Sequence, residues 1–254
     1  MLIDSHAHIQ DPQLRPDLEG VLERAHQARV GAIVCPGYDL QSSSAAIEIA
    51  DQHPQVVAAV GIHPNYLEDW RPDSLVQLAD WAQHPRVVAL GEMGLDYVNG
   101  PRDKKLQQEV FIRQLELAGK AGLPAIIHNR ESHADVLKIV REVGPLPRGG
   151  VMHCYSGSAE LAAEFIDLGY YISFAGPVTF KNARRLSQVA AAISPEWLLC
   201  ETDSPYLSPE PFRGRRNEPA RVVFVAERLA QLQNYPPEEL ASVMTANAKK
   251  LFGI

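Results

Sequence analysis

The first eight residues place two histidines and a carboxylate where they can act on one point. Leu2 and Ile3 are typical of the start of a short buried strand. Side chains two residues apart on a strand point the same way, so Asp4, His6 and His8 share one face. Imidazole nitrogens held on rigid backbone and aimed at one point are ligands for a divalent metal. The alternative is one hydrogen-bonded core histidine and one solvated histidine, and ligands from other strands decide between the two.

Further metal-competent side chains follow later apolar runs, each at the end of a different run: Glu92, His128, His153 and Asp203. Each has a structural explanation by itself, as a solvated carboxylate, a core histidine bonded to a carbonyl, or the cap of a turn. Their repeated placement at strand ends instead predicts one shared metal site. Its expected ligands are His6, His8, Glu92, His128, His153 and Asp203.

The elements that must position these residues alternate along the whole chain. Apolar runs typical of buried parallel strands begin at Leu2 and cover 31–35, 56–61, 87–92, 124–128, 150–153, 170–174 and 197–203. Helical spacing of apolar residues fills 17–29, 40–52, 73–83, 103–121, 132–142, 158–168 and 182–193, followed by helices from Pro219 and Pro237. About eight strand and helix pairs close a parallel barrel. We therefore expect an α/β fold, a TIM (β/α)8 barrel formed by residues 1–254 as one domain, with catalytic groups at the carboxyl ends of its strands.

The expected ligands outnumber the four of one closed zinc site, so we predict two divalent ions that share the strand-four carboxylate. In a closed barrel the last strand adjoins the first, which groups Asp203 with His6 and His8. The neighbouring fifth and sixth strands group His128 with His153. Two ions about 3.5 to 4 Å apart activate water and hold the attacking and leaving oxygens of a displacement, so hydrolysis is the expected reaction. Zinc, manganese and magnesium all suit these ligands.

Residues beside the predicted ligands supply a base and substrate contacts. Asp203 can accept the proton of the nucleophile. Glu201 is an alternative base or a residue that orients a ligand, against a structural role in the barrel interior. His63 is expected to contact substrate or stabilise developing charge, and Arg130, directly after His128, to hold a phosphate oxygen.

Composition restricts how such a site could meet its substrate. The net charge of -7 disfavours a general polyanion-binding surface, so contact with nucleic acid must be local. Four aromatic residues are candidates to stack unpaired bases, with packing as the alternative for each: Tyr97, Tyr155, Phe180 and Tyr206. No apolar run reaches the roughly 20 residues of a membrane span, and the odd count of three cysteines suits reduced packing residues. We expect a cytoplasmic protein with no membrane partner and no obligate protein partner.

Several ordered motifs that cover nearly the whole chain together resemble the TatD family of metal-dependent deoxyribonucleases. They are Asp4-Ser5-His6-Ala7-His8, Gly61-Ile62-His63-Pro64, Gly91-Glu92-Met93-Gly94-Leu95-Asp96-Tyr97, Ile127-His128-Asn129-Arg130, His153-Cys154-Tyr155-Ser156-Gly157 and Glu201-Thr202-Asp203-Ser204-Pro205. The resemblance implies a metal-dependent-hydrolase barrel, the same six ligands, and DNase activity on single strands or ends. Because Glu92 stands at the bridging position, no carboxylated lysine is needed.

Two other functions remain open from the sequence. The first is an ester or amide hydrolase on the same metals, for example a D-aminoacyl-tRNA deacylase. The second is a non-catalytic metal-binding protein. A shallow basic rim around the metals would favour the nuclease, and an enclosed apolar pocket would favour the deacylase. The surplus of ligands over four argues against a purely structural metal site.

Overall fold

The computed structural model describes residues 1–254, except for the side chain of Asp69. In this described part, eight parallel strands form one sheet in sequence order, each bonded to the next along the chain. The strands are β1 (Leu2–Asp4), β2 (Val30–Pro36), β3 (Val56–Val60), β4 (Val87–Asp96), β5 (Ala125–Arg130), β6 (Gly150–Met152), β7 (Tyr170–Phe174) and β8 (Leu198–Cys200).

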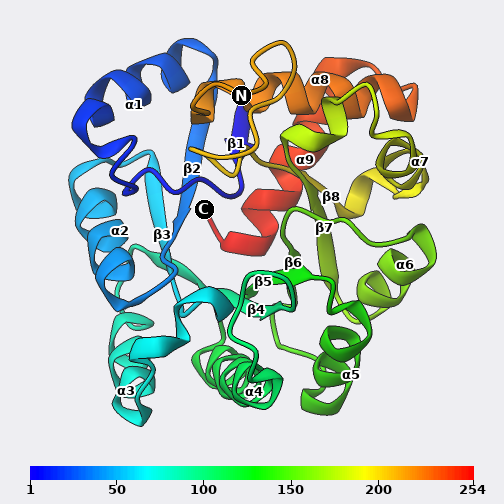
Figure 1. Cartoon of the computed structure of the whole chain (residues 1–254). Coiled ribbons are helices and arrows are strands. Elements are labelled where there is room, and N and C mark those ends of the chain that lie inside the picture. Colours follow the sequence, from blue (N-terminus) through cyan, green and yellow to red (C-terminus); the bar gives the residue numbers. More distant parts are fainter.

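Helices follow the strands and form an outer ring around the sheet (Figure 1). They are α1 (Leu18–Gln27), α2 (Leu40–Gln52), α3 (Pro72–Trp81), α4 (Lys104–Ala121), α5 (His133–Val143), α6 (Ala159–Asp167), α7 (Arg184–Ala192), α8 (Val222–Gln233) and α9 (Pro237–Phe252). Each strand and the helix after it bury apolar side chains against each other, which gives the strands their continuous apolar runs. No described helix combines the length and the apolar character needed to cross a bilayer.

The barrel closes through backbone contacts beyond the ends of β1 and β8. Ser5 N–H donates to the carbonyl of Cys200 at 3.2 Å, and Asp203 N–H donates to the carbonyl of His6 at 2.8 Å. His8 N–H then donates to the carbonyl of Ser204 at 2.7 Å. The first and last segments of the chain therefore lie side by side, as the sequence predicts. The predicted (β/α)8 barrel is confirmed.

A second apolar cluster fills the inside of the barrel. It contains at least one residue from each strand, including Ile126, Val151 and Leu199, together with Leu251 and Phe252 of α9. In Figure 1 the carboxyl end of α9 lies across the middle of the ring. Inward side chains alternate with a period of two, so the next inward positions after these three strand residues are occupied by His128, His153 and Glu201. The strands that hold the core therefore also aim the polar residues.

Two differences from the predicted strand boundaries affect the site. The eighth strand ends at Cys200, and Asp203 lies beyond it with a positive φ of 56° that an extended strand cannot contain. The fourth strand continues past Glu92 to Asp96 after a register shift against β5 between Leu90 and Met93. The end of β4 thereby carries two inward carboxylates instead of one.

Candidate metal centre

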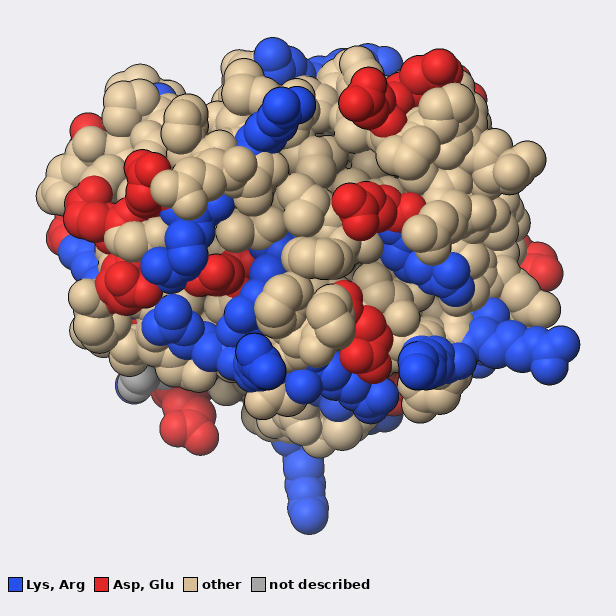
Figure 2. All heavy atoms as spheres, turned by 90° about the horizontal axis from the view of Figure 1, so that it is seen from above, with Lys and Arg blue, Asp and Glu red and all other residues tan. Residues whose placement is uncertain are grey.

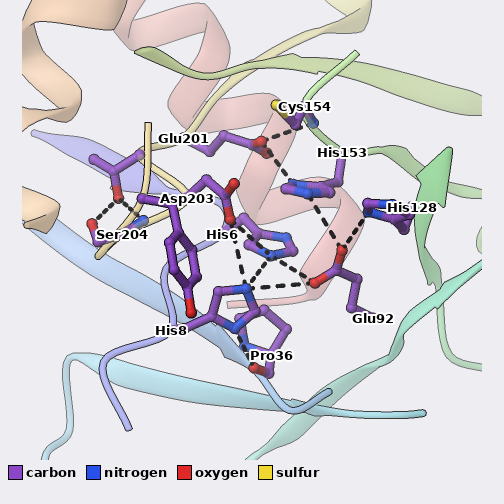
Figure 3. A network of polar contacts seen from close by, with 12 residues as sticks. His6, His8, Pro36, Glu92, His128, His153, Cys154, Glu201, Asp203 and Ser204 are labelled. Carbon is purple, nitrogen blue, oxygen red and sulfur yellow. Dashed lines mark hydrogen bonds and ion pairs between the residues drawn. The ribbon is translucent and has the colours of Figure 1, made fainter. Parts of the chain in front are cut away.

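Glu92 lies at the middle of the polar end of the barrel. Its position depends on Gly91, whose φ of 137° suits glycine and where a Cβ would lie 2.5 Å from the carbonyl oxygen of Ile126. The backbone N–H of Glu92 donates to the carbonyl of Gly37 at 2.9 Å, next to the end of β2. The Glu92 side chain is buried, with 5% exposed, and contacts imidazoles from the N-terminal segment and from the middle of the chain (Figure 3).

On one side of Glu92 the N-terminal histidines face Asp203. The Nε2 atoms of His6 and His8 are 3.1 Å apart, and they lie 3.3 and 3.5 Å from Glu92 Oε2. Asp203 Oδ1 lies 3.8 Å from His6 Nε2 and 3.6 Å from His8 Nε2. His8 Nδ1 contacts the carbonyl of Pro36 at 2.9 Å, and as a donor to this carbonyl it leaves the Nε2 lone pair free for a cation.

On the other side His128 and His153 face Glu92 Oε1. His128 Nδ1 lies 2.9 Å from this oxygen, and His153 Nε2 lies 3.4 Å from it. The remaining ring nitrogens meet carboxylates: His128 Nε2 lies 3.2 Å from Asp96 Oδ2, and His153 Nδ1 lies 2.8 Å from Glu201 Oε1. A carboxylate behind an imidazole fixes its orientation and increases its basicity as a ligand.

His63 also contacts Glu92, but with a neutral ring. Its Nδ1 accepts the backbone N–H of Asn65 at 3.0 Å, and its Nε2 lies 3.4 Å from Glu92 Oε1. Burial lowers the pKa of His63 to about 4, so the ring is neutral at pH 7. A neutral ring that accepts at Nδ1 carries its proton at Nε2. His63 therefore presents a hydrogen-bond donor to the centre instead of a metal ligand.

The buried carboxylates make positive charge electrostatically favourable in the centre. Burial raises the pKa of Glu92, but the imidazoles of His63, His153 and His6 outweigh burial and hold the pKa well below its ordinary value. Burial lowers the pKa of His153, but Glu201 and Glu92 outweigh it and raise the pKa to about 9. The site thus stabilises positive charge next to Glu92, which is the electrostatic requirement of a cation site.

The donor atoms fit a divalent metal. Two groups bring their ligand atoms within 4.8 Å of one another: His6, His8 and Asp203; His6, His153 and Glu201. Ligand atoms of Glu92 and His128 lie equally close together, with the donor His63 beside them. The buried Nδ1 of His6 has no hydrogen-bond partner among the described residues. Two Nε2 atoms that face each other at 3.1 Å beside two carboxylates form a nitrogen and oxygen ligand set typical of such ions.

The centre lies at the bottom of a cavity of about 580 Å³, whose lining includes His8, Glu92, His153 and Asp203. One side of the cavity is formed by Asn99 after β4, by Asn129 and exposed Arg130 at the end of β5, and by exposed Ser156 after β6. We call these four residues the polar wall. On the face that Figure 2 shows, positive and negative side chains are interspersed, and Lys and Arg gather toward the lower edge of the view. Among the described residues that line the cavity, Arg130 is the one Lys or Arg side chain.

The structure brings all six predicted ligands together around Glu92, and Glu201, His63 and Arg130 lie beside them. Their roles as ligands, bases and substrate contacts stay predictions. The sequence reasoning missed Asp96 as a partner of His128. Asp96 lies four residues after Glu92, on the same face of a strand, so a strand drawn to residue 96 would have found it.

Comparison with known proteins gives a consistent result. A family model described as TatD related DNase matches residues 3–253. The "uncharacterized metal-dependent hydrolase YabD" of Bacillus subtilis is 46% identical over 254 residues, which cover 100% of both chains. The "3'-5' ssDNA/RNA exonuclease TatD" of Citrobacter rodentium is 33% identical, with 100% of this chain and 98% of the relative covered. The crystal structure of the TatD homologue YjjV of Escherichia coli superposes with a TM-score of 0.95 at 34% identity, covering 100% of this chain and 98% of YjjV.

Proposed function

This chain belongs to the family of TatD-related DNases, metal-dependent hydrolases of ester bonds, and we propose that it is a deoxyribonuclease that cleaves single-stranded DNA at a two-metal centre. The observation that carries the proposal is the convergence of imidazole nitrogens on both oxygens of Glu92 at the bottom of a cavity whose lining residues mostly carry polar side chains. The name of the Citrobacter relative, a single-strand exonuclease, supports the choice of substrate.

The residues that would hold the metals fall into two groups that share Glu92. His6, His8 and Asp203 would hold one ion, and His128 and His153 the other. Divalent ions bound there supply Lewis acidity, which polarises a phosphoryl oxygen and acidifies water.

We assign the proton acceptor to Asp203. Its carboxylate lines the cavity, whereas Glu201 is 1% exposed and is occupied by His153 Nδ1 and by the backbone N–H of Cys154, which it accepts at 2.8 Å. Glu201 therefore suits the orientation of His153 better than contact with a reacting group. The Nε2–H of His63 and the guanidinium of Arg130 are the donors we assign to phosphate oxygens.

The lining of the cavity favours a phosphodiester over an aminoacyl ester. Most of its residues carry polar side chains, and Arg130, Asn99 and Ser156 are exposed at its rim. A deacylase would need an enclosed apolar pocket for the amino-acid side chain. Cleavage of charged tRNA in preference to DNA is therefore the outcome that would replace this proposal.

The test measures cleavage by metal-depleted protein restored with zinc, manganese or magnesium in turn. The substrates are single-stranded DNA, duplex DNA, RNA and charged tRNA. We expect no cleavage without metal and highest kcat/KM on single-stranded DNA with at least one ion. Metal-independent cleavage would overturn the proposal, as would restored protein that leaves all DNA intact.

A further inference from the structure

A group of three tyrosines forms the side of the cavity opposite the polar wall. Tyr38 follows β2, Tyr66 follows β3 and Tyr206 follows β8, whereas the polar wall lies at or after the carboxyl ends of β4, β5 and β6. We call these three residues the aromatic wall. Because neighbouring strands occupy neighbouring positions around the barrel, the two walls stand on opposite halves of the ring with the metal centre between them.

The aromatic wall is anchored to the metal centre by ring contacts. The rings of Tyr38 and Tyr66 stack with centroids 4.7 Å apart at an angle of 30°. His8 contacts both Tyr38 and Tyr206 edge to face, with centroids 5.5 and 6.3 Å away, and Tyr66 lies 6.1 Å from His63 in the same way. The hydroxyl of Tyr206 contacts Asp11 at 3.0 Å, which fixes the ring direction.

The outer rings of this wall remain exposed. Tyr66 is 44% exposed and Tyr206 is 46% exposed. Among the described residues seven large apolar or aromatic side chains are exposed, and Tyr66, Tyr206 and Leu207 all line this one cavity. Apolar surface gathered at the mouth of a polar site marks a place where a ligand binds.

The other aromatic residues that the sequence offered for stacking are occupied. Tyr155 is buried and donates to the carbonyl of Ser158, while the Tyr97 hydroxyl donates to Asp135. Phe180 packs against Arg213, whose guanidinium carbon lies 4.2 Å from the centroid of the Phe180 ring. These contacts favour packing for Tyr97, Tyr155 and Phe180. Tyr206 lines the cavity together with two tyrosines that sequence reasoning did not select.

We propose that the aromatic wall is a base-binding subsite, in which Tyr66, supported from behind by Tyr38, stacks on the base next to the scissile phosphate. The polar wall with Arg130 then meets the backbone on the other side of the bond. This proposal rests on the proposed function, since it names how the DNase would hold its substrate. Stacking on a tyrosine face requires an unpaired base but no particular base, so the subsite selects single strands without selecting sequence.

The test combines a change in the enzyme with a change in the substrate. Wild type, Tyr66→Ala and Tyr66→Phe are assayed on a short single-stranded oligonucleotide and on copies with one abasic residue at each position around the cleaved bond. We expect Tyr66→Ala to lower kcat/KM on the intact strand by about 5- to 160-fold, the range for loss of one base–aromatic stack. Tyr66→Phe should keep nearly all activity, because the phenyl ring still stacks.

The decisive result lies on the abasic strands. At one abasic position the kcat/KM of wild type should fall by the same factor by which Tyr66→Ala lowers kcat/KM on the intact strand. On that abasic strand, wild type and Tyr66→Ala should have equal kcat/KM. If Tyr66→Ala lowers kcat/KM relative to wild type by the same factor at every abasic position, the proposed subsite is wrong. If wild type cleaves no DNA, the proposed function and the subsite are both wrong. If wild type cleaves the abasic strands as fast as the intact strand, only the subsite is wrong.

Tyr235 provides the matched control, because it is 36% exposed and follows α8, outside the lining of the cavity. Tyr235→Ala should cleave every strand as wild type does. A second measurement uses 2-aminopurine at the abasic-sensitive position in the presence of metal-free enzyme, which binds without cleaving. Its fluorescence should be quenched by wild type and Tyr66→Phe and remain high with Tyr66→Ala, and equal quenching by all three would contradict stacking.

Discussion

The two halves of the barrel interior are formed by the same strands but differ in polarity. Toward the amino ends, inward residues such as Ile126, Val151 and Leu199 form an apolar cluster with the carboxyl end of α9. Two residues further along the same strands, the inward positions carry His128, His153 and Glu201. The polar half buries charges that are costly to desolvate, and the apolar half contributes the hydrophobic stabilisation that offsets this cost.

The difference between the halves explains how the ligand side chains are held rigidly. A metal centre needs its ligands held within a fraction of an ångström, and strands whose next inward residue is locked in a packed core supply that precision. The apolar half should therefore govern stability, and the polar half should govern activity. The following experiments test that separation, from the largest expected effect to the smallest.

Removal of a carboxylate from the polar half should abolish turnover with little loss of stability. We expect Asp203→Ala to reduce kcat/KM on DNA by on the order of 10³-fold or more, as when a catalytic unit loses one member. Thermal unfolding of the metal-free variant should stay close to that of wild type, because the change removes the desolvation cost of the Asp203 carboxylate while His8 keeps Glu92 as a partner. His128→Ala should behave alike, and His26→Ala on the exposed face of α1 is the control. Undiminished cleavage by either variant would contradict the assigned site.

Truncation in the apolar half should do the reverse. Phe252 is 2% exposed within the inner cluster, so Phe252→Ala should lower the free energy of unfolding by about 3 to 5 kcal/mol. Denaturant unfolding measures this loss, while kcat of the fraction that remains folded should change little. Phe252→Leu should recover most of the stability. A variant that unfolds normally but loses its kcat would break the separation between the halves.

The carboxylates behind the ligands should give intermediate effects. Glu201→Gln keeps the size of the side chain but removes the charge that faces His153 Nδ1. We expect metal affinity or kcat/KM to fall by about 10- to 100-fold, the usual cost of losing such a partner. Titration with metal, followed by kinetics at saturating metal, separates loss of affinity from loss of chemistry. If kcat falls to background at full metal occupancy, Glu201 and not Asp203 is the base.

The smallest effect belongs to the rim of the polar half. Arg130→Ala should raise KM for DNA about tenfold, the value of one charge-assisted hydrogen bond, and leave metal affinity unchanged. The salt dependence of KM should weaken as well, because one phosphate contact is lost. Arg113→Ala, on the exposed side of α4 beside Glu109, is the charge-matched control. Identical kinetics of Arg130→Ala and wild type would remove Arg130 from the substrate site.

Much of this protein was determined by its sequence alone. Regular alternation of apolar runs and helical patterns predicts the barrel, because strands covered on both faces must be apolar throughout. Because the carboxyl ends of parallel strands open on one face of a barrel, the sequence then predicts that six side chains meet there: His6, His8, Glu92, His128, His153 and Asp203. These inferences succeed because they depend on regular geometry.

Only the tertiary structure decided what depends on departures from that geometry. The continuation of β4 to Asp96 follows a register shift, and the position of Asp203 follows a positive φ, neither of which has a periodic signal. The aromatic wall comes from three loops whose separation in sequence says nothing about their distance in space. Which tyrosines are exposed is set by the neighbours that pack against them, and those neighbours are known only once the chain has folded.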